Sequence, residues 1–185
     1  MQAIEALLTR RSARTLKDPA PDDGALALIL ESATRAPDHG RLRPWRFIVI
    51  RGHSRAKYGE LLAEHLRRSR STVTEEALQR ERNKAFRAPL IVVAAAIVDP
   101  EGKIPVIEQV LSAGAAAQNI LLASRVLGFN AVWKTGTAAY DGTVKAAFGL
   151  ASKDSIVGFI YVGTEDEGPD MPRPAWRDFA KEWEE

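Results

Sequence analysis

The sequence predicts one domain of mixed α-helices and β-strands over residues 1–185. Apolar residues recur at helical spacing in some segments, and short runs rich in Val, Ile and aromatic residues are typical of strands in others. No repeat, low-complexity tract or linker divides the chain. A fold of this length buries about 70% of the surface of its unfolded chain, which is enough for a hydrophobic core and a concave ligand site.

In the N-terminal half, apolar spacing and turn residues predict the elements. Asp22 or Asp23 can cap a helix whose apolar side chains share one face. Two prolines and a glycine between Ala36 and Pro44 predict a loop, and the alternating residues after it predict a strand. We expect, in order, a helix from Ile4 to near Arg10, a helix from Asp22 or Asp23 to Ala33, a strand over 46–51, a helix opening at Ser54, and a basic stretch from Arg67 to Arg87 with weak helical patterning.

In the C-terminal half, a long helix is the main prediction. Pro105 suits its first turn, and Gly128 suits the left-handed position at its C-terminal end. The small residues from Ser112 to Ala117 let another backbone approach closely, as in a tight core or a dimer. We expect, in order, a buried strand over 90–98, the helix over 105–128, a strand over 130–134, a helix over 143–148 and a strand over 155–162, with a peripheral tail after Gly163.

Composition excludes several kinds of site. The chain has no cysteine, so it has no thiol nucleophile, no Cys-x-x-Cys redox centre and no thiolate metal site. Its 26 Lys and Arg residues against 24 Asp and Glu leave a formal charge of +2, which is too small to indicate a nucleic-acid protein. The longest apolar run, Pro89 to Val98, is about half the roughly 20 residues of a membrane span. We therefore expect a cytoplasmic protein without membrane or nucleic-acid partners.

Common catalytic motifs are missing from the sequence. It contains no G-x-G-x-x-G that opens a helix after a strand, no G-x-x-x-x-G-K-[ST], no H-E-x-x-H and no G-x-S-x-G. The three histidines, His39, His53 and His65, lack the spacing of metal ligands. We therefore expect no metal site, and the Rossmann, P-loop, zincin and α/β-hydrolase interpretations lose their main support.

Three groups of polar residues stand next to chain breaks and are candidates for ligand binding. Paired guanidinium groups and a hydroxyl are donors that hold phosphate, and a cation beside an indole at a strand end can line a flat ligand. Each group also has an ordinary interpretation, as a solvated helix end, a loop histidine or a core tryptophan. The three groups are Arg10, Arg11 and Ser12; Arg35 and His39; and Trp133, Lys134 and Thr135.

Together these groups and their flanking residues resemble the nitroreductase family of FMN-dependent oxidoreductases, and in particular its small members. The resemblance runs nearly end to end, in a fixed order. The motifs that carry it are I-E-A-L-L-T-R-R-S from Ile4, R-A-P-D-H from Arg35, P-W-R-F from Pro44, R-A-P-L-I-V from Arg87, S-A-G from Ser112, G-F-N-A-V-W-K-T-G from Gly128 and I-V-G-F-I-Y-V-G from Ile156.

The resemblance implies an α+β, three-layer fold with a central mixed, mainly antiparallel sheet flanked by helices. It also implies an intertwined homodimer with FMN at the subunit interface. NADH or NADPH would reduce the flavin, and a small electron-poor acceptor such as a nitroaromatic or a quinone would reoxidise it in a ping-pong scheme. The flavin would carry the chemistry.

The resemblance also assigns roles to residues. Arg10, Arg11 and Ser12 would hold the ribityl phosphate, Arg35 and His39 would reach the flavin from their loop, and Trp133, Lys134 and Thr135 would line its rings. Lys134 is the expected cation for the charge that reduction leaves on the ring. Weaker candidates for nicotinamide contacts are Ala123, Ser124, Arg125, Val126, Leu127 and Gly128.

One segment departs from the family pattern. Many relatives carry Asn and Gln before the Pro-Trp pair, whereas Gly40, Arg41, Leu42 and Arg43 stand here. Arg41 or Arg43 could favour an anionic substrate or NADPH, or be a solvated loop charge. The identity of the acceptor therefore stays open.

Two alternatives to the enzyme remain. One is a fold of this kind that keeps flavin as a structural or sensing ligand without turnover. The other is a polyanion-binding protein that uses the basic segment 67–87. Interleaved glutamates and the scarcity of aromatic residues in that segment favour instead a solvated helix that covers the active site. The basic residues are Arg67, Arg68, Arg70, Arg80, Arg82, Lys84 and Arg87.

Overall fold

The structure is a computed structural model that describes residues 3–165 and 172–183. The helices are α1 (Ala3–Thr9), α2 (Asp23–Ala33), α3 (Ser54–Ser69), α4 (Glu75–Lys84), α5 (Val106–Val126) and α6 (Gly142–Ala147). The strands are β1 (Trp45–Arg51), β2 (Leu90–Ala96), β3 (Asn130–Lys134) and β4 (Ser155–Gly163). Short 3₁₀ turns are η1 (His39–Arg41), η2 (Thr137–Tyr140) and η3 (Trp176–Asp178).

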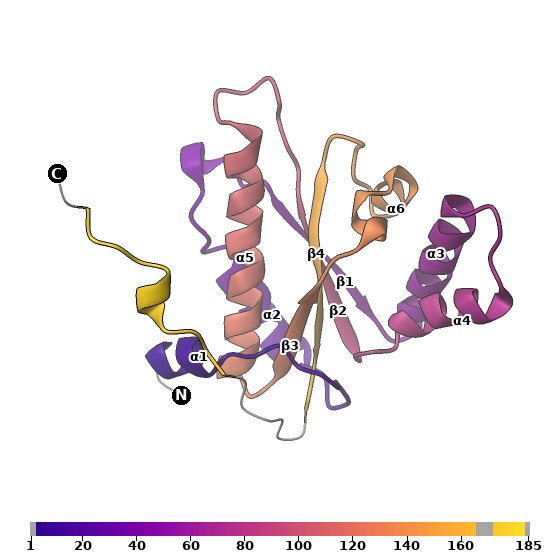
Figure 1. Cartoon of the computed structure of the whole chain (residues 1–185), viewed down its shortest axis with the longest axis horizontal. Helices are drawn as coiled ribbons and strands as arrows, with labels where there is room; N and C mark the ends of the chain where they lie inside the picture. The colour runs from indigo at the N-terminus through magenta and orange to yellow at the C-terminus, as the bar shows by residue number, and fades with distance from the viewer. Residues whose placement is uncertain (1–2, 166–171, 184–185) are drawn as a thin grey trace.

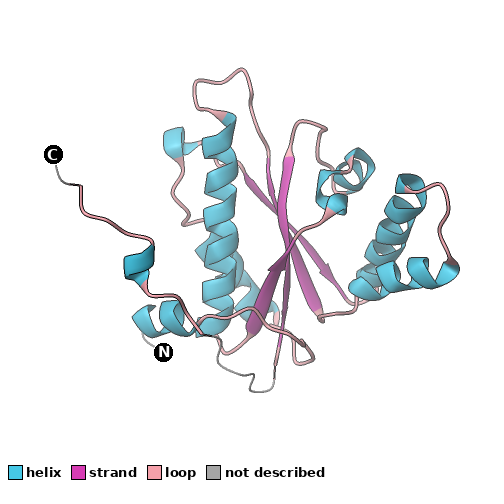
Figure 2. Ribbon diagram, viewed as in Figure 1, coloured by secondary structure: helices cyan, strands magenta, loops and turns pink. Residues whose placement is uncertain are grey.

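These elements form three layers around the sheet (Figures 1 and 2). Helices α2 and α5 lie on one side of the sheet, and α3, α4 and α6 lie on the other. The strand order is β1-β2-β4-β3, and each of the three strand pairs in the described part of the chain is antiparallel. The α+β fold class with a mainly antiparallel sheet is therefore confirmed, while the homodimer stays a prediction.

Period-two alternation gives the sheet two apolar faces. Ile91, Val93 and Ala95 of β2 pack toward α3 and α6, and Leu90 and Val92 pack toward α2 and α5. Every residue of β2 is buried, because this strand has a neighbour on each edge and helices on each face. The sequence prediction of a buried strand is confirmed, although the strand ends at Ala96, two residues before the predicted end.

Helix α5 is the long helix that the sequence predicts. Its small residues Ala113, Ala116 and Ala117 are fully buried, and the helix contacts β2, β3 and β4. By length and composition it is the one helix in the described ranges that could cross a membrane, but its packing is that of a core helix. After the helix, Gly128 has the left-handed conformation (φ 88°) expected from its position.

The basic stretch from Arg67 to Arg87, for which the sequence shows only weak helical patterning, forms well-defined helices in the structure. Its first part extends α3 to Ser69, and its second part forms α4, whose first turn is capped by the Thr74 hydroxyl accepting from Ala77 N–H. The helices α3 and α4 pack on each other. Tertiary contact therefore stabilises two helices of largely polar composition, whose few large apolar side chains are buried or half-buried.

The C-terminal arm, residues 172–183, leaves the body of the molecule, as the sequence predicts for the tail (Figure 1). Three of its aromatic side chains are largely exposed, namely Trp176, Phe179 and Trp183. A hydrogen bond from the Arg173 guanidinium to Arg10 C=O joins the arm to the loop after α1. The start of the predicted tail is not peripheral, because Thr164 pairs with Lys17 and Glu165 pairs with Arg11.

Candidate functional site

Two of the three predicted residue groups lie at opposite ends of strand β3. The loop after α1 is attached to the start of the strand, because Ala13 N–H donates to Ala131 C=O at 3.1 Å. This bond brings Arg10, Arg11 and Ser12 beside the start of β3. The group at the other end begins at Trp133. From Ala131 to Lys134 the strand rises about 10 Å, at about 3.3 Å a residue.

Three guanidinium groups gather at the start of β3. Arg10 and Arg11 line a small cavity with Arg125 of α5 and with Asn130. Arg11 forms an ion pair of 2.6 Å with Glu165, whereas Arg10 and Arg125 have no ion-pair partner among the residues described. The Nε of Arg125 is buried and has no hydrogen-bond partner in the described part of the chain. We call this group the arginine cavity; its excess of positive charge suits an anion.

Glu165 orders the loop beside this cavity, and the sequence analysis did not find it. Its Oε1 accepts from the N–H groups of Arg14 at 2.6 Å and Thr15 at 3.3 Å, while Oε2 contacts Arg11. Glu165 lies just after β4, at the far end of the sequence, so no local pattern connects it to Arg11. Arg11 thus has a structural partner, which leaves Arg10 and Arg125 as the free donors.

The segment expected to contact nicotinamide divides at the end of α5. Arg125 joins the arginine cavity, and Ser124 is fully buried, with its hydroxyl donating to Ile120 C=O at 2.8 Å. Val126 and Leu127 are exposed. The contact with nicotinamide stays a prediction for this segment.

At the other end of β3, Trp133 and Lys134 point to opposite faces of the sheet. Trp133 packs on the α5 face and donates from Nε1 to Val157 C=O at 3.1 Å. Lys134 and Thr135 line a cavity on the opposite face, together with residues of α3 and α4. These three residues can therefore line one flat ligand only along the edge of the strand, not from a single face.

A hydrogen-bonded network fixes the chain that follows Thr135. His65 Nε2 lies 2.9 Å from the Thr137 hydroxyl, and its Nδ1 lies 3.1 Å from Asp141. Asp141 also caps α6, accepting from Val144 N–H at 2.9 Å, and pairs with Arg68 at 3.2 Å. Burial raises the pKa of Asp141, but the Val144 N–H, His65 and Arg68 outweigh it, so the pKa lies below its usual value.

Arg35 and His39 are paired with glutamates of other elements in this chain. Arg35 pairs with Glu31 of α2 at 2.9 Å, and His39 Nδ1 lies 2.5 Å from Glu108 in the first turn of α5. Glu108 and Arg125 are 17 residues apart on α5, which is about 25 Å at 1.5 Å a residue. A single chain therefore does not bring His39 to the arginine cavity.

The loop that departs from the family pattern is held by Asp38. Its carboxylate accepts from Leu42 N–H at 3.2 Å and Arg43 N–H at 2.7 Å. Arg41 and Arg43 both have positive φ angles, of 54° and 49°, a conformation that non-glycine residues adopt infrequently. These bonds hold the backbone there, and a contact of either arginine with substrate stays a prediction.

Most cations of the basic segment are already paired. Arg67 and Arg68 contact Glu64, Arg80 contacts Glu76, and Arg82 contacts Glu60 and Glu75. Such pairs belong to a solvated helical face, and a polyanion partner for this segment stays an alternative.

Comparison with known proteins identifies relatives over most of the chain. A sequence model of the family described as "Nitroreductase family" matches residues 7–164. The Escherichia coli K12 protein named "Putative NAD(P)H nitroreductase YdjA" is 39% identical over 164 residues, 89% of this chain and 88% of that protein. A Haemophilus influenzae protein named "Putative NAD(P)H nitroreductase" is 38% identical over 165 residues, 89% of each chain.

Solved structures of nitroreductase-like proteins are also similar to this chain in fold. A nitroreductase-like family protein from Bacillus cereus has a TM-score of 0.83 and 26% identity, covering 98% of this chain and 95% of that one. A structure described as a putative nitroreductase in complex with FMN, from Desulfovibrio desulfuricans, has a TM-score of 0.75 and 28% identity, covering 98% and 96%.

The position of Trp133 depends on Gly158 of the neighbouring strand. A Cβ on Gly158 would collide with Nε1 and Cδ1 of the indole. We predict that Gly158→Ala displaces Trp133 and lowers the free energy of unfolding by about 1–3 kcal/mol, the usual cost of overpacking. Urea unfolding followed by tryptophan fluorescence measures it.

Gly142→Ala is the matched control for this variant. Gly142 has nothing within 4 Å of an added Cβ, so its stability should stay within about 0.5 kcal/mol of the parent. Equal stabilities of the two variants would show that the indole does not need the space over Gly158.

Proposed function

The chain belongs to the nitroreductase family, and on that premise we propose that it is an FMN-dependent enzyme that passes electrons from NADH or NADPH to a small electron-poor acceptor. A nitroaromatic or a quinone is the expected kind of acceptor. The names of the curated relatives and the FMN complex of a structural neighbour at 28% identity support this proposal.

The arginine cavity is the observation that carries the proposal, because its residues fit the phosphate of FMN. A phosphate monoester carries a charge of about −1.5 to −2 at pH 7 and three acceptor oxygens. Arg10 and the unpartnered Nε of Arg125 supply donors at the cavity, and Ser12 follows Arg11 in the same loop. The edge of β3 then leads about 10 Å to Trp133, Lys134 and Thr135, which is where the ring system would lie.

In the proposed mechanism the protein binds FMN, orients its ring system and supplies positive charge. FMN, when bound, accepts hydride from the nicotinamide and passes electrons to the acceptor. Arg10, Arg125 and Ser12 hold the phosphate end, and Thr135 and the backbone at the end of β3 orient the ring. Lys134 supplies positive charge that stabilises the reduced ring. The nicotinamide and the electron acceptor bind in turn at the same exposed position. Because FMN would carry the redox chemistry, no side chain has to act as a nucleophile.

Steady-state kinetics test this function. Protein saturated with FMN should oxidise NADH or NADPH with a quinone or nitroaromatic acceptor, and initial-rate plots at several acceptor concentrations should give parallel lines. Intersecting lines would contradict the shared place for donor and acceptor. Bound FMN that neither nicotinamide reduces would establish the non-catalytic flavin-binding alternative, and a protein that takes up no FMN would exclude both.

Arg10→Ala should weaken FMN binding without loss of the fold. Hydrogen bonds to a charged partner contribute roughly 1.5–3 kcal/mol, so we expect the Kd for FMN to rise roughly 10- to 150-fold. Fluorescence titration with FMN measures this rise. Arg51→Ala removes the same charge at an exposed pair with Asp23 and should bind FMN like the parent. An unchanged Kd in Arg10→Ala would leave Arg10 as a helix-end cation only.

We also propose that the enzyme is a homodimer in which Arg35 and His39 of one copy complete the site of the other. This proposal is supported because Glu31 and Glu108 hold these two residues in one chain, and Glu108 lies about 25 Å along α5 from Arg125 of the arginine cavity. An exposed apolar face extends over α5, where Ile107, Leu111 and the half-exposed Gly114 follow each other at helical spacing. Helix α1, which contacts α5 and lies beside its C-terminal end (Figure 1), presents further exposed apolar side chains, namely Ile4, Leu7 and Leu8.

Leu111→Lys should weaken this dimer. Leu111 is 63% exposed in the single chain, so the substitution should leave the free energy of unfolding of the monomer within about 0.5 kcal/mol. Sedimentation velocity should show a dimer for the parent and a monomer with reduced FMN content for the variant. Tyr140→Lys, on the α6 side of the sheet, is the control and should stay dimeric. A parent that sediments as a monomer and still binds FMN would contradict the proposal.

A further inference from the structure

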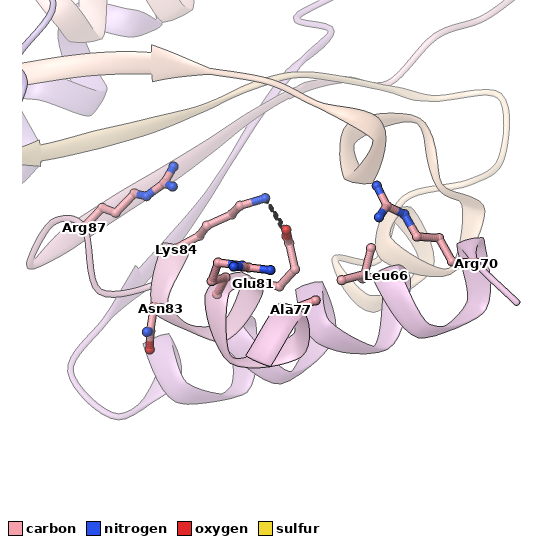
Figure 3. A pocket seen from close by; sticks show the side chains of 8 residues that line it. Leu66, Arg70, Ala77, Glu81, Asn83, Lys84 and Arg87 are labelled. Carbon is pink, nitrogen blue, oxygen red and sulfur yellow. Dashed lines mark hydrogen bonds and ion pairs between the residues drawn. The ribbon is translucent and has the colours of Figure 1, made fainter. Parts of the chain in front are cut away.

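A second polar cavity lies at the end of β3, on the opposite face of the sheet from α5. Its volume is about 110 Å³, and its cationic side chains are Lys84 and Arg87 from the end of α4 and Lys134 from β3. It adjoins a wider groove of about 620 Å³ between α3 and α4, with which it shares Glu81, Lys84 and Arg87. Figure 3 shows this groove, with the Lys84–Glu81 pair between Arg87 and Arg70. We call the smaller space the α4 cavity.

The charges around the α4 cavity do not cancel. Glu81 is the one carboxylate in its lining. It is paired with Lys84, whose Nζ donates to Glu81 Oε1 at 2.5 Å and to Oε2 at 2.6 Å. Arg87 and Lys134 form no ion pair with any residue that the structure describes. This differs from Arg80 and Arg82 of α4, which are paired with glutamates of α4 and α3. The cavity therefore keeps two positive charges without a partner.

The floor of the cavity adds no negative charge. Tyr58 and Tyr161 are buried and hydrogen bonded to each other. Burial raises the pKa of both phenols, and the charge of Arg87 acts on both in the opposite direction. Arg87 lines the same cavity as the two tyrosines.

The wall that faces Arg87 provides hydroxyl groups. Thr135 and Thr137 both line the cavity, on either side of Gly136. Gly136 has φ 135° and ψ −180°, a conformation that is essentially restricted to glycine. The bond from Thr137 to His65 fixes this bend against α3. The wall is thus held in place by a strained glycine and a buried histidine.

We propose that the α4 cavity binds a phosphate group. A phosphate of about −1.5 to −2 charge matches the two unpaired cations, and the fork of Arg87 can donate to two oxygens at once. A volume of about 110 Å³, in which one water occupies roughly 10–15 Å³, has room for one tetrahedral ion. The site differs from the arginine cavity, because the two lie at opposite ends of β3.

Titration of inorganic phosphate into FMN-saturated protein tests the site. In a buffer free of phosphate, calorimetry should show one saturable site per chain. Arg87→Gln should weaken binding at least tenfold, and Glu81→Gln should tighten it, because Lys84 is then released toward the anion. Arg51→Gln removes the same charge at the exposed pair with Asp23 and should bind phosphate like the parent.

Opposite shifts in the two variants are the decisive result, since loss of a structural role would weaken binding in both. Absence of saturable binding, or weakening in Glu81→Gln, would overturn the proposal. If the protein takes up no FMN, the same titration is made in an Arg10→Ala background, where the arginine cavity has lost a donor. A phosphate site that still responds to Arg87→Gln would then stand although the proposed function had failed.

Two sources can supply this phosphate, and kinetics distinguish them. If it is the ribose 2′-phosphate of NADPH, inorganic phosphate competes with NADPH and not with NADH, and Arg87→Gln raises the KM for NADPH alone. If it is free phosphate, it competes with neither nucleotide. Both results support the phosphate site. Of these experiments, only the competition with NADPH and NADH rests on the proposed function.

Discussion

Burial of the two central strands on both faces is the constraint on which the rest of the structure depends. Strands β2 and β4 have neighbours on each edge and helices on each face, so nearly all of their side chains are apolar and buried. A charged group there would need a buried partner. Polar chemistry is therefore confined to the margins of the sheet, and the edge strand β3, with helix α5 beside it, carries the candidate site.

Charge is distributed unequally along that edge. At α2, α3 and α4, several cations are matched by glutamates three or four residues away, an arrangement that contributes little to stability. At the two ends of β3, Arg10 and Arg125, and then Arg87 and Lys134, line cavities without an ion-pair partner among the described residues. The unpartnered Nε of Arg125 is costly when buried, and Arg87 and Lys134 place two like charges on one cavity. Both arrangements become favourable when an anion is bound.

One chain is an incomplete unit for the proposed chemistry. The groups at the two ends of β3 come together through contacts within the chain, whereas Arg35 and His39 are held by Glu31 and Glu108 on other surfaces. The exposed apolar face of α5 runs between these places. A second copy that covered this face would bury apolar area and bring its own loop to the site, so assembly and cofactor binding would be coupled.

The sequence by itself determined the elements, the family resemblance and the groups at each end of β3. Helix α5, strand β3 and the buried β2 follow from local patterns of apolar, small and β-branched residues, which depend only on near neighbours. The tertiary structure alone decided that Arg125 joins Arg10 and Arg11, that Glu165 neutralises one of them, and that Arg87 meets Lys134 over Tyr58. These contacts follow from β4 inserting between β2 and β3 and from helices packing across the sheet. No local sequence pattern predicts such contacts between residues far apart in the chain, because the packing of whole helices and strands determines them.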